Sequence, residues 1–348
     1  MSGSLTSLSR RGLLSIGVAG AGAALARPVL GEPATLNAQL SGYLDGLHDP
    51  VMIRDGDIYH VFGSGGWTGK AGLSWRISND LHSWRDNGSP FDSVPDWAAK
   101  AIPDARAIWA PDIQFVDGLF RLYYSVSTAG SMRSVTGFAT SPTLDRGSAR
   151  YGWTDHGLVV ESFAGGTYNV IDANFVVDFA GDHWLAFGSY WSGLKLVALD
   201  KKSGKPKAGA PIHPIAYRPP AAPGGDEPVE GAFLFPRDGY YYLFVSYDYC
   251  CRKEKSNYYV AVGRARSITG PYLSKEGEPI LDGHGTVVLA ETPWGSTNWR
   301  GPGHCGLYRD RTRDLIVYHA YDVANAARPT LRLAELAWDK EGWPIALA

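Results

Sequence analysis

One pattern occurs five times along the chain, and this repetition constrains the fold more than any other feature of the sequence. Each copy has an acidic or polar lead position, four to six mostly apolar residues, a turn and then an aromatic-rich run. The intervals between successive lead positions are 58 to 74 residues, about 64 on average. The lead positions are Asp49, Asp112, Asp172, Glu230 and His304.

Each copy is typical of a β-hairpin, because two β-rich runs flank a turn such as Asp117-Gly118 or Asp238-Gly239. Asp-Gly turns supply the positive φ that a tight hairpin connection needs. Small antiparallel sheets repeated at this period are the signature of a propeller, in which blades surround a central channel. The sequence therefore predicts an all-β fold, a five-bladed β-propeller. We find no long amphipathic helix and no linker, so residues 27–348 are expected to form a single domain.

The first 26 residues are typical of an export signal. The segment Ser9-Arg10-Arg11-Gly12-Leu13-Leu14 resembles a twin-arginine motif, and Ala24-Leu25-Ala26 has the small-x-small form of a cleavage site. The uncharged run between them is shorter than the roughly 20 apolar residues that a membrane span needs. We therefore predict a twin-arginine-type signal peptide over residues 1–26, a periplasmic or secreted protein, and no membrane partner.

The charge balance limits the choice of partner. Lys and Arg number 33 against 35 Asp and Glu, a formal net charge of −2. A nucleic-acid partner would require a basic surface that neutralises phosphates, so none is expected. The 12 Trp, 19 Tyr and 12 Phe residues favour strands and can also stack on sugars. We expect a monomer.

The three cysteines give little information about the fold. Cys250 and Cys251 are neighbours and Cys305 is distant, so three thiols cannot all pair within one chain. A periplasmic location would permit a disulfide to Cys305. Two or three buried free thiols is the interpretation that we favour, and the spacing does not suit a zinc site.

The repeat also predicts where chemistry could occur. If each lead residue begins the innermost strand of its blade, then four carboxylates and one imidazole converge at one mouth of the channel. Several carboxylates around a pocket are typical of glycoside hydrolysis. A single carboxylate at a strand start usually caps a turn, so the argument depends on the equivalence of the five positions.

Several segments of the chain resemble glycoside hydrolase family 43, and in particular its endo-1,5-α-L-arabinanase branch. The resemblance covers residues 45 to 340, and family 43 members are five-bladed propellers. The matching motifs include His48-Asp49-Pro50, Ile108-Trp109-Ala110-Pro111-Asp112, Tyr168-Asn169-Val170-Ile171-Asp172, Gly188-Ser189-Tyr190-Trp191, Val229-Glu230-Gly231 and Gly301-Pro302-Gly303-His304.

The resemblance implies a role for each of three carboxylates. Asp49 matches the general base, which activates a water and must stay ionised. Glu230 matches the general acid, which must hold a proton for the leaving oxygen. Asp172 matches a third carboxylate whose negative charge supports and orients the acid. The family inverts configuration, so the base and the acid should lie about 6.5 to 9.5 Å apart.

The resemblance also suggests supporting residues. His304 matches a histidine that helps to hold a metal ion, usually taken as calcium, although calcium prefers oxygen ligands. His48, Asn169 and Ser189 flank catalytic positions and could contact substrate. Trp109 could border the sugar site, while Asp112 is expected to brace its blade. Trp75, Trp109, Tyr190 and Trp191 are candidates for stacking platforms or for core packing.

The sequence as a whole predicts an exported, inverting endo-arabinanase acting on plant cell-wall arabinan or arabino-oligosaccharides. Two loops bear on the endo assignment: 218–228 and 290–300 precede Glu230 and His304 and could close one end of the groove. An exo-acting α-L-arabinofuranosidase or β-xylosidase of the same family is therefore an alternative. A non-catalytic glycan-binding propeller is the alternative of another class.

Overall fold

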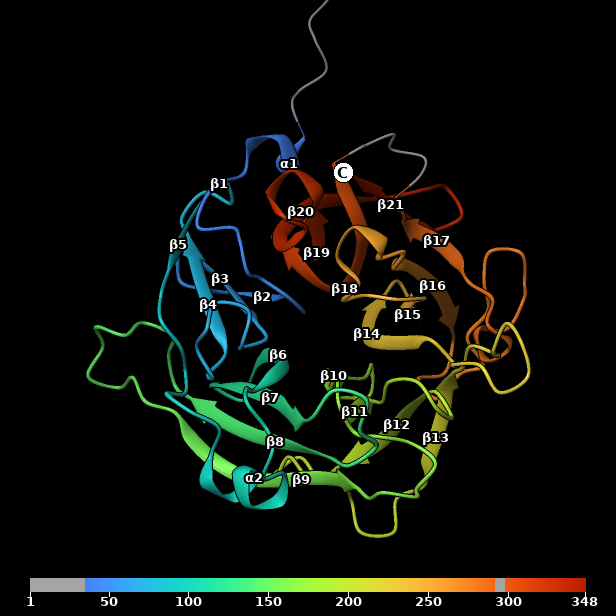
Figure 1. The fold of residues 1–348 in the computed structure, drawn as a ribbon, viewed down its shortest axis with the longest axis horizontal. Coiled ribbons are helices and arrows are strands. Elements are labelled where there is room, and N and C mark those ends of the chain that lie inside the picture. Colours follow the sequence, from blue (N-terminus) through green and yellow to red (C-terminus); the bar gives the residue numbers. More distant parts are fainter. Residues whose placement is uncertain (1–34, 292–297) are drawn as a thin grey trace, which may run out of the picture. The chain divides into compact units, whose positions relative to one another are not determined.

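The computed structural model describes residues 35–291 and 298–348, which form five sheets placed around a central axis (Figure 1). The predicted signal peptide, residues 1–26, lies outside the described residues. Apart from β1, which pairs with β5 at the edge of the first sheet, the strands of each sheet follow the chain order, so each sheet is one blade built from one sequence repeat. This confirms the predicted all-β, five-bladed propeller. No helix within 35–291 or 298–348 is long and apolar enough to cross a membrane.

The first two blades contain nine strands. Blade 1 comprises β1 (Ser41–Gly42), β2 (Val51–Asp55), β3 (Ile58–Gly63), β4 (Ser74–Ser78) and β5 (Ser83–Asp86). Blade 2 comprises β6 (Trp109–Val116), β7 (Leu119–Ser127), β8 (Ser134–Ser141) and β9 (Thr154–Ser162). Short helices α1 (Leu36–Gln39) and α2 (Asp96–Ala101) precede them.

The remaining three blades have four strands each. Blade 3 comprises β10 (Asn174–Val177), β11 (His183–Phe187), β12 (Leu194–Leu199) and β13 (Ile212–Ala216). Blade 4 comprises β14 (Val229–Arg237), β15 (Tyr240–Tyr247), β16 (Tyr259–Ala265) and β17 (Thr286–Leu289). Blade 5 comprises β18 (Trp299–Asp310), β19 (Arg313–Asp322), β20 (Arg328–Trp338) and β21 (Pro344–Leu347). Three 3₁₀ turns are η1 (Lys253–Lys255), η2 (Ile280–Asp282) and η3 (Val323–Asn325).

The five predicted hairpins are the inner strand pairs of the five blades, β2–β3, β6–β7, β10–β11, β14–β15 and β18–β19. The Asp-Gly turns behave as expected, since Asp117 and Gly118 both have positive φ, 54° and 79°. Both residues of a type I′ hairpin turn require that conformation. The hairpin prediction is therefore confirmed at the level of individual turns.

Aromatic side chains of the inner strands pack in the core. Trp75 on β4 is fully buried, lies against Phe62 with ring centroids 5.0 Å apart, and donates its indole N–H to His60. The core interpretation of Trp75 therefore holds, and this ring is unavailable as a stacking platform.

Four blades have a non-glycine residue in the left-handed conformation on their inner strand or two residues before it. The backbone N–H of each of these residues bonds to a side chain at the end of the second strand of the preceding blade. The pairs are Asp49 to His319, Ala110 to Ser64, Asp172 to Ser125 and His304 to Ser246. The same inter-blade bond therefore holds equivalent positions, whether or not the side chain carries chemistry.

The register predicted for the second repeat is wrong. Ala110, with φ 37°, occupies the left-handed position of blade 2, and Asp112 lies two residues deeper in β6. Asp112 is buried and accepts a hydrogen bond from the backbone N–H of Phe175 in blade 3, 2.7 Å away. It braces neighbouring blades, as expected, but it does not face the mouth as a lead residue.

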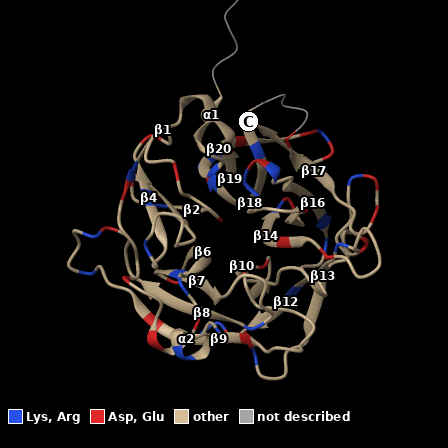
Figure 2. Cartoon of the chain, viewed as in Figure 1, with Lys and Arg blue, Asp and Glu red and all other residues tan. Residues whose placement is uncertain are grey.

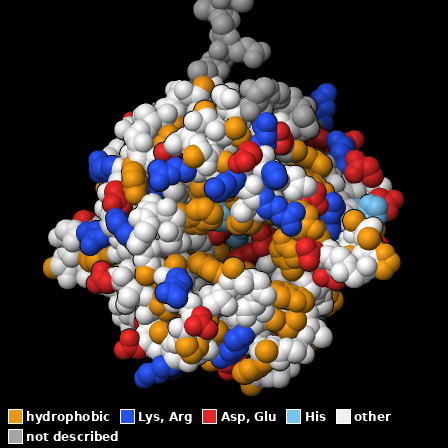
Figure 3. Space-filling view, in the orientation of Figure 1, with side chains coloured by type: hydrophobic (Ala, Val, Ile, Leu, Met, Phe, Trp, Pro, Cys, Tyr) orange, Lys and Arg blue, Asp and Glu red, His pale blue; other side chains and the backbone are white. Residues whose placement is uncertain are grey.

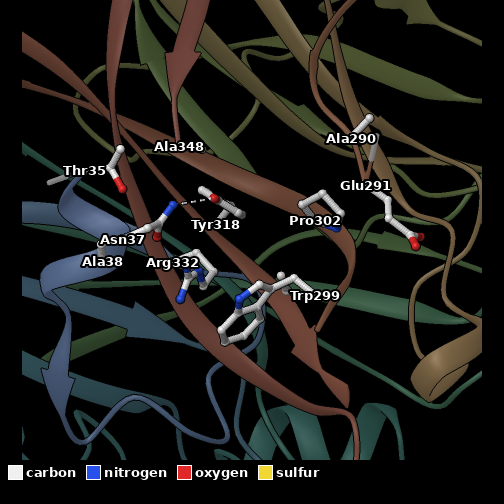
Figure 4. Close-up of a pocket in the computed structure, with 11 residues that line it drawn as sticks. Thr35, Asn37, Ala38, Ala290, Glu291, Trp299, Pro302, Tyr318, Arg332 and Ala348 are labelled. Atoms are coloured by element: carbon white, nitrogen blue, oxygen red, sulfur yellow. Dashed lines mark hydrogen bonds between the residues drawn. The ribbon is translucent and has the colours of Figure 1, made fainter. Parts of the chain in front are cut away.

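The segment around α1 joins blade 5 to blade 1. Asn37 donates to the hydroxyl of Tyr318 on β19, and its side-chain oxygen accepts from Leu333 on β20 (Figure 4). A few residues later, β1 pairs in parallel with β5 through Ser41 and Ser83. This short segment therefore closes the ring between its first and last blades.

Candidate active site

A hollow at the centre of one face contains acidic and histidine side chains (Figure 3). Charged residues of both signs are spread over the outer strands and loops of the ring, and an acidic residue also marks the inner strand β14 (Figure 2). Asp49, Asp172, Glu230 and His304 influence one another's charge, which places the four predicted residues in one cluster. The blades that supply them are 1, 3, 4 and 5.

Asp49 is surrounded by three hydrogen-bond donors. Its Oδ1 lies 2.7 Å from Nδ1 of His48 and 3.0 Å from Nδ1 of His304. The Ser64 hydroxyl donates to Oδ2 at 2.5 Å. Ser64 also accepts from the backbone N–H of Ala110, so blade 2 helps to fix this hydroxyl.

These contacts keep Asp49 ionised. Burial alone would favour its neutral form, but the charges of His48 and His304 and their hydrogen bonds outweigh burial and hold the pKa of Asp49 well below its usual value. The pKa of His304 changes in the complementary direction. Burial opposes its protonation, yet the carboxylates of Asp49, Asp172 and Glu230 raise the pKa of His304 to about 9. An imidazolium therefore faces an ionised Asp49 at neutral pH.

His48 orients Asp49 through its own fixed position. The ring stacks between Trp67, with centroids 4.7 Å apart, and His319, with centroids 3.8 Å apart. Its Nε2 lies 2.8 Å from the hydroxyl of Tyr321. Since Asp49 and Tyr321 engage both ring nitrogens, the geometry favours an orienting role for His48 over the predicted contact with substrate.

Glu230 lies among neutral hydroxyl groups. Ser189 donates to its Oε2 at 2.7 Å, and Tyr258 donates to its Oε1 at 2.8 Å. Burial, with the charge of Glu230 adding, raises the pKa of Tyr258 well above its usual value, so this hydroxyl stays a donor. Asn169, in turn, accepts from the backbone N–H of Ser189 at 2.8 Å. Ser189 and Asn169, predicted to contact substrate, thus hold the candidate acid in place.

Asp172 differs from its expected state. It is buried, and burial raises its pKa, with Glu230 and Asp49 adding to the effect and His304 opposing it, to about 8. Its Oδ2 accepts a hydrogen bond from the backbone N–H of Gly231, directly after the acid. Asp172 therefore holds a proton at neutral pH and is tied to the same strand as Glu230, instead of standing beside it as a second negative charge.

Glycine in the His304 motif makes room for Tyr258. A Cβ on Gly303 would lie 1.9 Å from Cδ1 of the Tyr258 ring. Any other residue at this position would displace the ring and its hydrogen bond to Glu230. The Gly-Pro-Gly-His segment therefore positions Tyr258 beside Glu230, in addition to carrying His304.

The aromatic candidates divide into buried and accessible rings. Trp109 on β6 and Trp191 after β11 are half-buried, so either ring remains accessible at the surface. Trp67, which the sequence did not single out, is 42% exposed while its ring covers His48. Trp67 is therefore a further accessible aromatic ring next to the candidate base.

Several site residues lack any motif of their own. Tyr321 and His319 come from β19, and Tyr258 precedes β16. Burial first, with the charge of His48 adding, holds the pKa of His319 well below its usual value, so the ring stays neutral and accepts from the backbone N–H of Asp49. A possible signal is the alternation in Tyr318-His319-Ala320-Tyr321, which sends His319 and Tyr321 to one face of the strand.

The predicted state of the cysteines is wrong for two of the three. Cys250 and Cys251 form a disulfide with each other, and Cys251 is exposed. Cys305 is the buried free thiol, next to His304 in β18. The bend after β15 brings the neighbouring side chains together, which the sequence spacing alone did not indicate.

The residues near His304 do not form an oxygen-rich calcium site. Both carboxylate oxygens of Asp49 already accept hydrogen bonds, from the imidazoles of His48 and His304 and from Ser64. His304 itself keeps a proton at neutral pH. Among the described residues, two groups have atoms close enough to hold an ion: one comprises His48, Asp49 and His319, and the other comprises His48, Cys250 and Cys251. Calcium prefers six to eight oxygen ligands, so the donor set does not fit it and we derive no chemical step through a metal.

Of the two loops that bear on endo action, one is described in full and the other in part. Arg218, at the start of the 218–228 loop, pairs with Asp248 at 2.9 Å, which ties that loop to the segment after β15. The other predicted loop, 290–300, includes residues 292–297 outside the described part of the chain.

A separate pocket of about 280 Å³ lies beside α1 and β18–β20 (Figure 4). Glu291 is the one acidic side chain among its lining residues, so the pocket lacks the acid and base pair of the central hollow.

Comparison with known proteins gives consistent matches. The model of "Glycosyl hydrolases family 43" matches residues 44–344. An extracellular endo-α-(1→5)-L-arabinanase of Bacillus subtilis is 40% identical over 299 residues, 86% of this chain and 87% of its own. An extracellular exo-α-(1→5)-L-arabinofuranosidase of Cellvibrio japonicus is 37% identical over 305 residues, 86% of this chain and 85% of its own. The structure of Cellvibrio cellulosa α-L-arabinanase complexed with arabinohexaose has a TM-score of 0.80 at 35% identity, covering 87% of this chain and 96% of that one.

Proposed function

The chain belongs to glycosyl hydrolase family 43, and from this premise we propose that it hydrolyses α-1,5-linked L-arabinan with inversion of configuration. The observation that carries the proposal is the contrast between two carboxylates of one hollow. Imidazoles hold Asp49 ionised, while neutral hydroxyls and a protonated carboxyl surround Glu230. An inverting glycosidase needs one carboxylate of each kind.

The reaction follows from these states. Asp49 takes a proton from a water as that water attacks the anomeric carbon on the side opposite the leaving group. Glu230 gives a proton to the glycosidic oxygen as the bond breaks, so the new reducing end has the β-configuration. The 6.5 to 9.5 Å separation of the two carboxylates remains a prediction of this mechanism.

Asp172 acts on the acid. Its backbone contact at Gly231 fixes the strand that carries Glu230, and its raised pKa keeps a proton beside the acid. In a pair of interacting carboxyls the proton belongs to the pair rather than to one member. We therefore propose that Asp172 and Glu230 together retain the proton that leaves with the product alcohol.

We propose attack at internal bonds, which makes the protein an endo-arabinanase. The 40% identical relative named as an endo-arabinanase supports this choice. The relative named as an exo-arabinofuranosidase keeps exo action as the alternative. A binding-only propeller is disfavoured, because all three carboxylates are present with partners suited to catalysis.

Substrate, location and assembly follow the same premise. We propose plant cell-wall arabinan or arabino-oligosaccharides as substrate, export through the signal over residues 1–26, and a monomer. The relatives named as extracellular support export. The family resemblance predicts calcium at His304, whereas the donors around Asp49 and His304 do not fit that ion. The metal content of the purified protein tests this prediction.

The decisive experiment digests linear α-1,5-arabinan with the purified protein and follows the products by size and by NMR of the anomeric proton. Mixed oligomers that appear early with β-configured reducing ends would support the inverting endo-enzyme. Arabinose as the sole product would exclude endo action, and α-configured products would exclude inversion. The absence of any cleavage would contradict the proposed function itself.

A further inference from the structure

A disulfide between two neighbouring residues lies beside the candidate base. Cys250 and Cys251 follow β15, and Sγ of Cys251 lies 3.6 Å from Nε2 of His48 and 3.7 Å from the hydroxyl of Tyr321. The mechanism above does not use this bridge. The bridge nevertheless contacts His48, which bonds to the base, and Tyr321, which bonds to His48.

A chain of hydrogen bonds runs from the bridge to the base. The backbone N–H of Cys251 donates to the hydroxyl of Tyr321 at 2.9 Å, and that hydroxyl lies 2.8 Å from Nε2 of His48. The opposite ring nitrogen of His48 lies 2.7 Å from Oδ1 of Asp49. Each group in the series fixes the orientation of the next, so the position of Cys251 bears on the position of the reacting carboxylate.

Cys251 adopts a backbone conformation that it would not choose freely. Its φ is 65°, in the left-handed region that a residue with a Cβ seldom adopts. Such a conformation persists only where the surroundings determine it. The covalent link to Cys250 supplies that constraint and keeps the N–H of Cys251 directed at Tyr321.

The rest of the loop has independent supports. Asp248 pairs with Arg218, the backbone N–H of Tyr249 bonds to Asn257, and the backbone N–H of Arg252 bonds to Ser256. Opening the bridge should therefore release Cys251 locally while the loop as a whole stays in place.

We infer that the Cys250–Cys251 disulfide is a positioning element for the catalytic base, acting through Tyr321 and His48. The inference rests on the proposed hydrolytic function. It predicts that kcat depends on the bridge, because a small displacement of a reacting group costs far more in rate than in substrate binding.

The test compares the oxidised and the reduced full-length protein on linear arabinan. A phosphine reductant supplies two electrons and becomes the phosphine oxide with oxygen from water, while the S–S bond breaks and each sulfur takes up a proton. We expect kcat to fall about tenfold, KM to change less than about twofold, and reoxidation to restore kcat. Titration of denatured protein should find one thiol, Cys305, before reduction and three after it.

Two variants identify the route. The double variant Cys250→Ser/Cys251→Ser should match the reduced protein and show no response to reductant. Tyr321→Phe removes the hydroxyl that links Cys251 to His48. Reduction of the disulfide in this variant should therefore lower kcat by less than about twofold further. Thermal unfolding of each variant checks that it is folded, and the reduced wild-type protein carries the test where a variant is not.

The outcomes separate this inference from the proposed function. An untreated protein that does not cleave arabinan contradicts the proposed function. An active protein that has three thiols before reduction, or whose kcat is unchanged by reduction, overturns only the role of the bridge. A full tenfold effect in Tyr321→Phe overturns the route through Tyr321.

Discussion

The base side and the acid side of the hollow each contain a reacting carboxyl group, but imidazoles contact the one on the base side and hydroxyls contact the one on the acid side. On the base side, blades 1 and 5 place the imidazoles of His48 and His304 against Asp49. On the acid side, blades 3 and 4 supply the hydroxyl of Ser189 and the strand that carries Glu230, and Tyr258 adds a second hydroxyl.

The difference shows how one scaffold produces two protonation states. A carboxylate next to cationic donors loses its proton readily, whereas a buried carboxyl next to another carboxylate retains it. The pKa of Asp49 is held well below its usual value, while that of Asp172 is raised to about 8. Both residues occupy the same left-handed position of their blades, so the neighbours, and not the backbone, set the chemistry.

The largest expected effect comes from removing the base. Asp49→Asn keeps the size of the side chain but cannot take a proton from water, so kcat should fall about 10³- to 10⁴-fold. The loss should be the same for arabinan and for an arabinoside with an acidic phenol as leaving group, because both need an activated water. Steady-state rates on the two substrates measure this.

A matched control for that variant is Asp112→Asn. Asp112 is also a buried carboxyl at an inner strand, and burial raises its pKa to about 7. It bonds to Phe175 and has no contact with the base. Its replacement should lower stability while leaving kcat within about twofold, and an equal loss of kcat in both variants would contradict the role of Asp49.

Removing the acid should separate the two substrates. Glu230→Gln cannot protonate the leaving oxygen, so kcat on arabinan should fall about 10²- to 10³-fold. An acidic phenol leaves without protonation, so its release should slow by less than about tenfold. The ratio of the two rates is the measurement, and equal losses would mean that Glu230 is not the acid. If Glu230→Gln hydrolysed arabinan at an unchanged rate, Glu230 would not be catalytic, and the alternative of a non-catalytic glycan-binding propeller would be favoured.

The repeat predicted much of this comparison from sequence. Five lead positions predicted the number of blades and brought Asp49, Asp172, Glu230 and His304 together, because similar positions on the inner strands meet at one mouth. Glu230 lies one residue before the left-handed position of blade 4, which is Gly231. The register failed at Asp112, since the left-handed position of blade 2 holds Ala110 and so has no polar side chain to mark it.

The partners of the carboxylates were less accessible to sequence reasoning. His319 and Tyr321 lie on the second strand of blade 5, where His319 contacts Asp49 and Tyr321 contacts His48 from about 270 residues away along the chain. Ser64 follows the second strand of blade 1 and contacts Asp49 from 15 residues away. Each resembles an ordinary strand residue until the blades are arranged around the axis. The protonated state of Asp172 likewise depends on burial and on two neighbouring carboxylates, which only the folded chain supplies.

A change in pH, compared between the wild type and an Asp172 variant, tests the acid side, because His304 on the base side also loses its proton at alkaline pH, near its raised pKa of about 9. Because the pKa of Asp172 is raised to about 8, this carboxyl holds its proton below that pH and loses it above. Activity should therefore fall as the pH rises through about 8, when the pair of Asp172 and Glu230 gives up its proton. In Asp172→Asn the acid loses the carboxyl that shares this proton, so the alkaline limb of kcat/KM should move to lower pH.

The same variant should remain active at acid pH. An asparagine resembles the protonated form of Asp172, so kcat at pH 5 should stay within about tenfold of the wild type. The acidic limb, which reports the base, should not move. A shift of that limb with an unchanged alkaline limb would place Asp172 on the base side and break the comparison.

The smallest expected effect concerns one hydroxyl on the acid side. Tyr258→Phe removes the donor to Oε1 of Glu230 and leaves Ser189 on Oε2, so the carboxyl keeps one of two neutral partners. A hydrogen bond of this kind contributes about 1 kcal/mol, which corresponds to roughly a fivefold loss of kcat. Tyr59→Phe is the matched control, because Tyr59 donates to a carboxylate, Asp310, outside the hollow. Thermal unfolding should show a similar destabilisation of both variants, whereas kcat should fall only in Tyr258→Phe. An equal fall in both would mean that the hydroxyls serve the fold alone, and that Glu230 owes its orientation to Ser189 and to the strand that carries it.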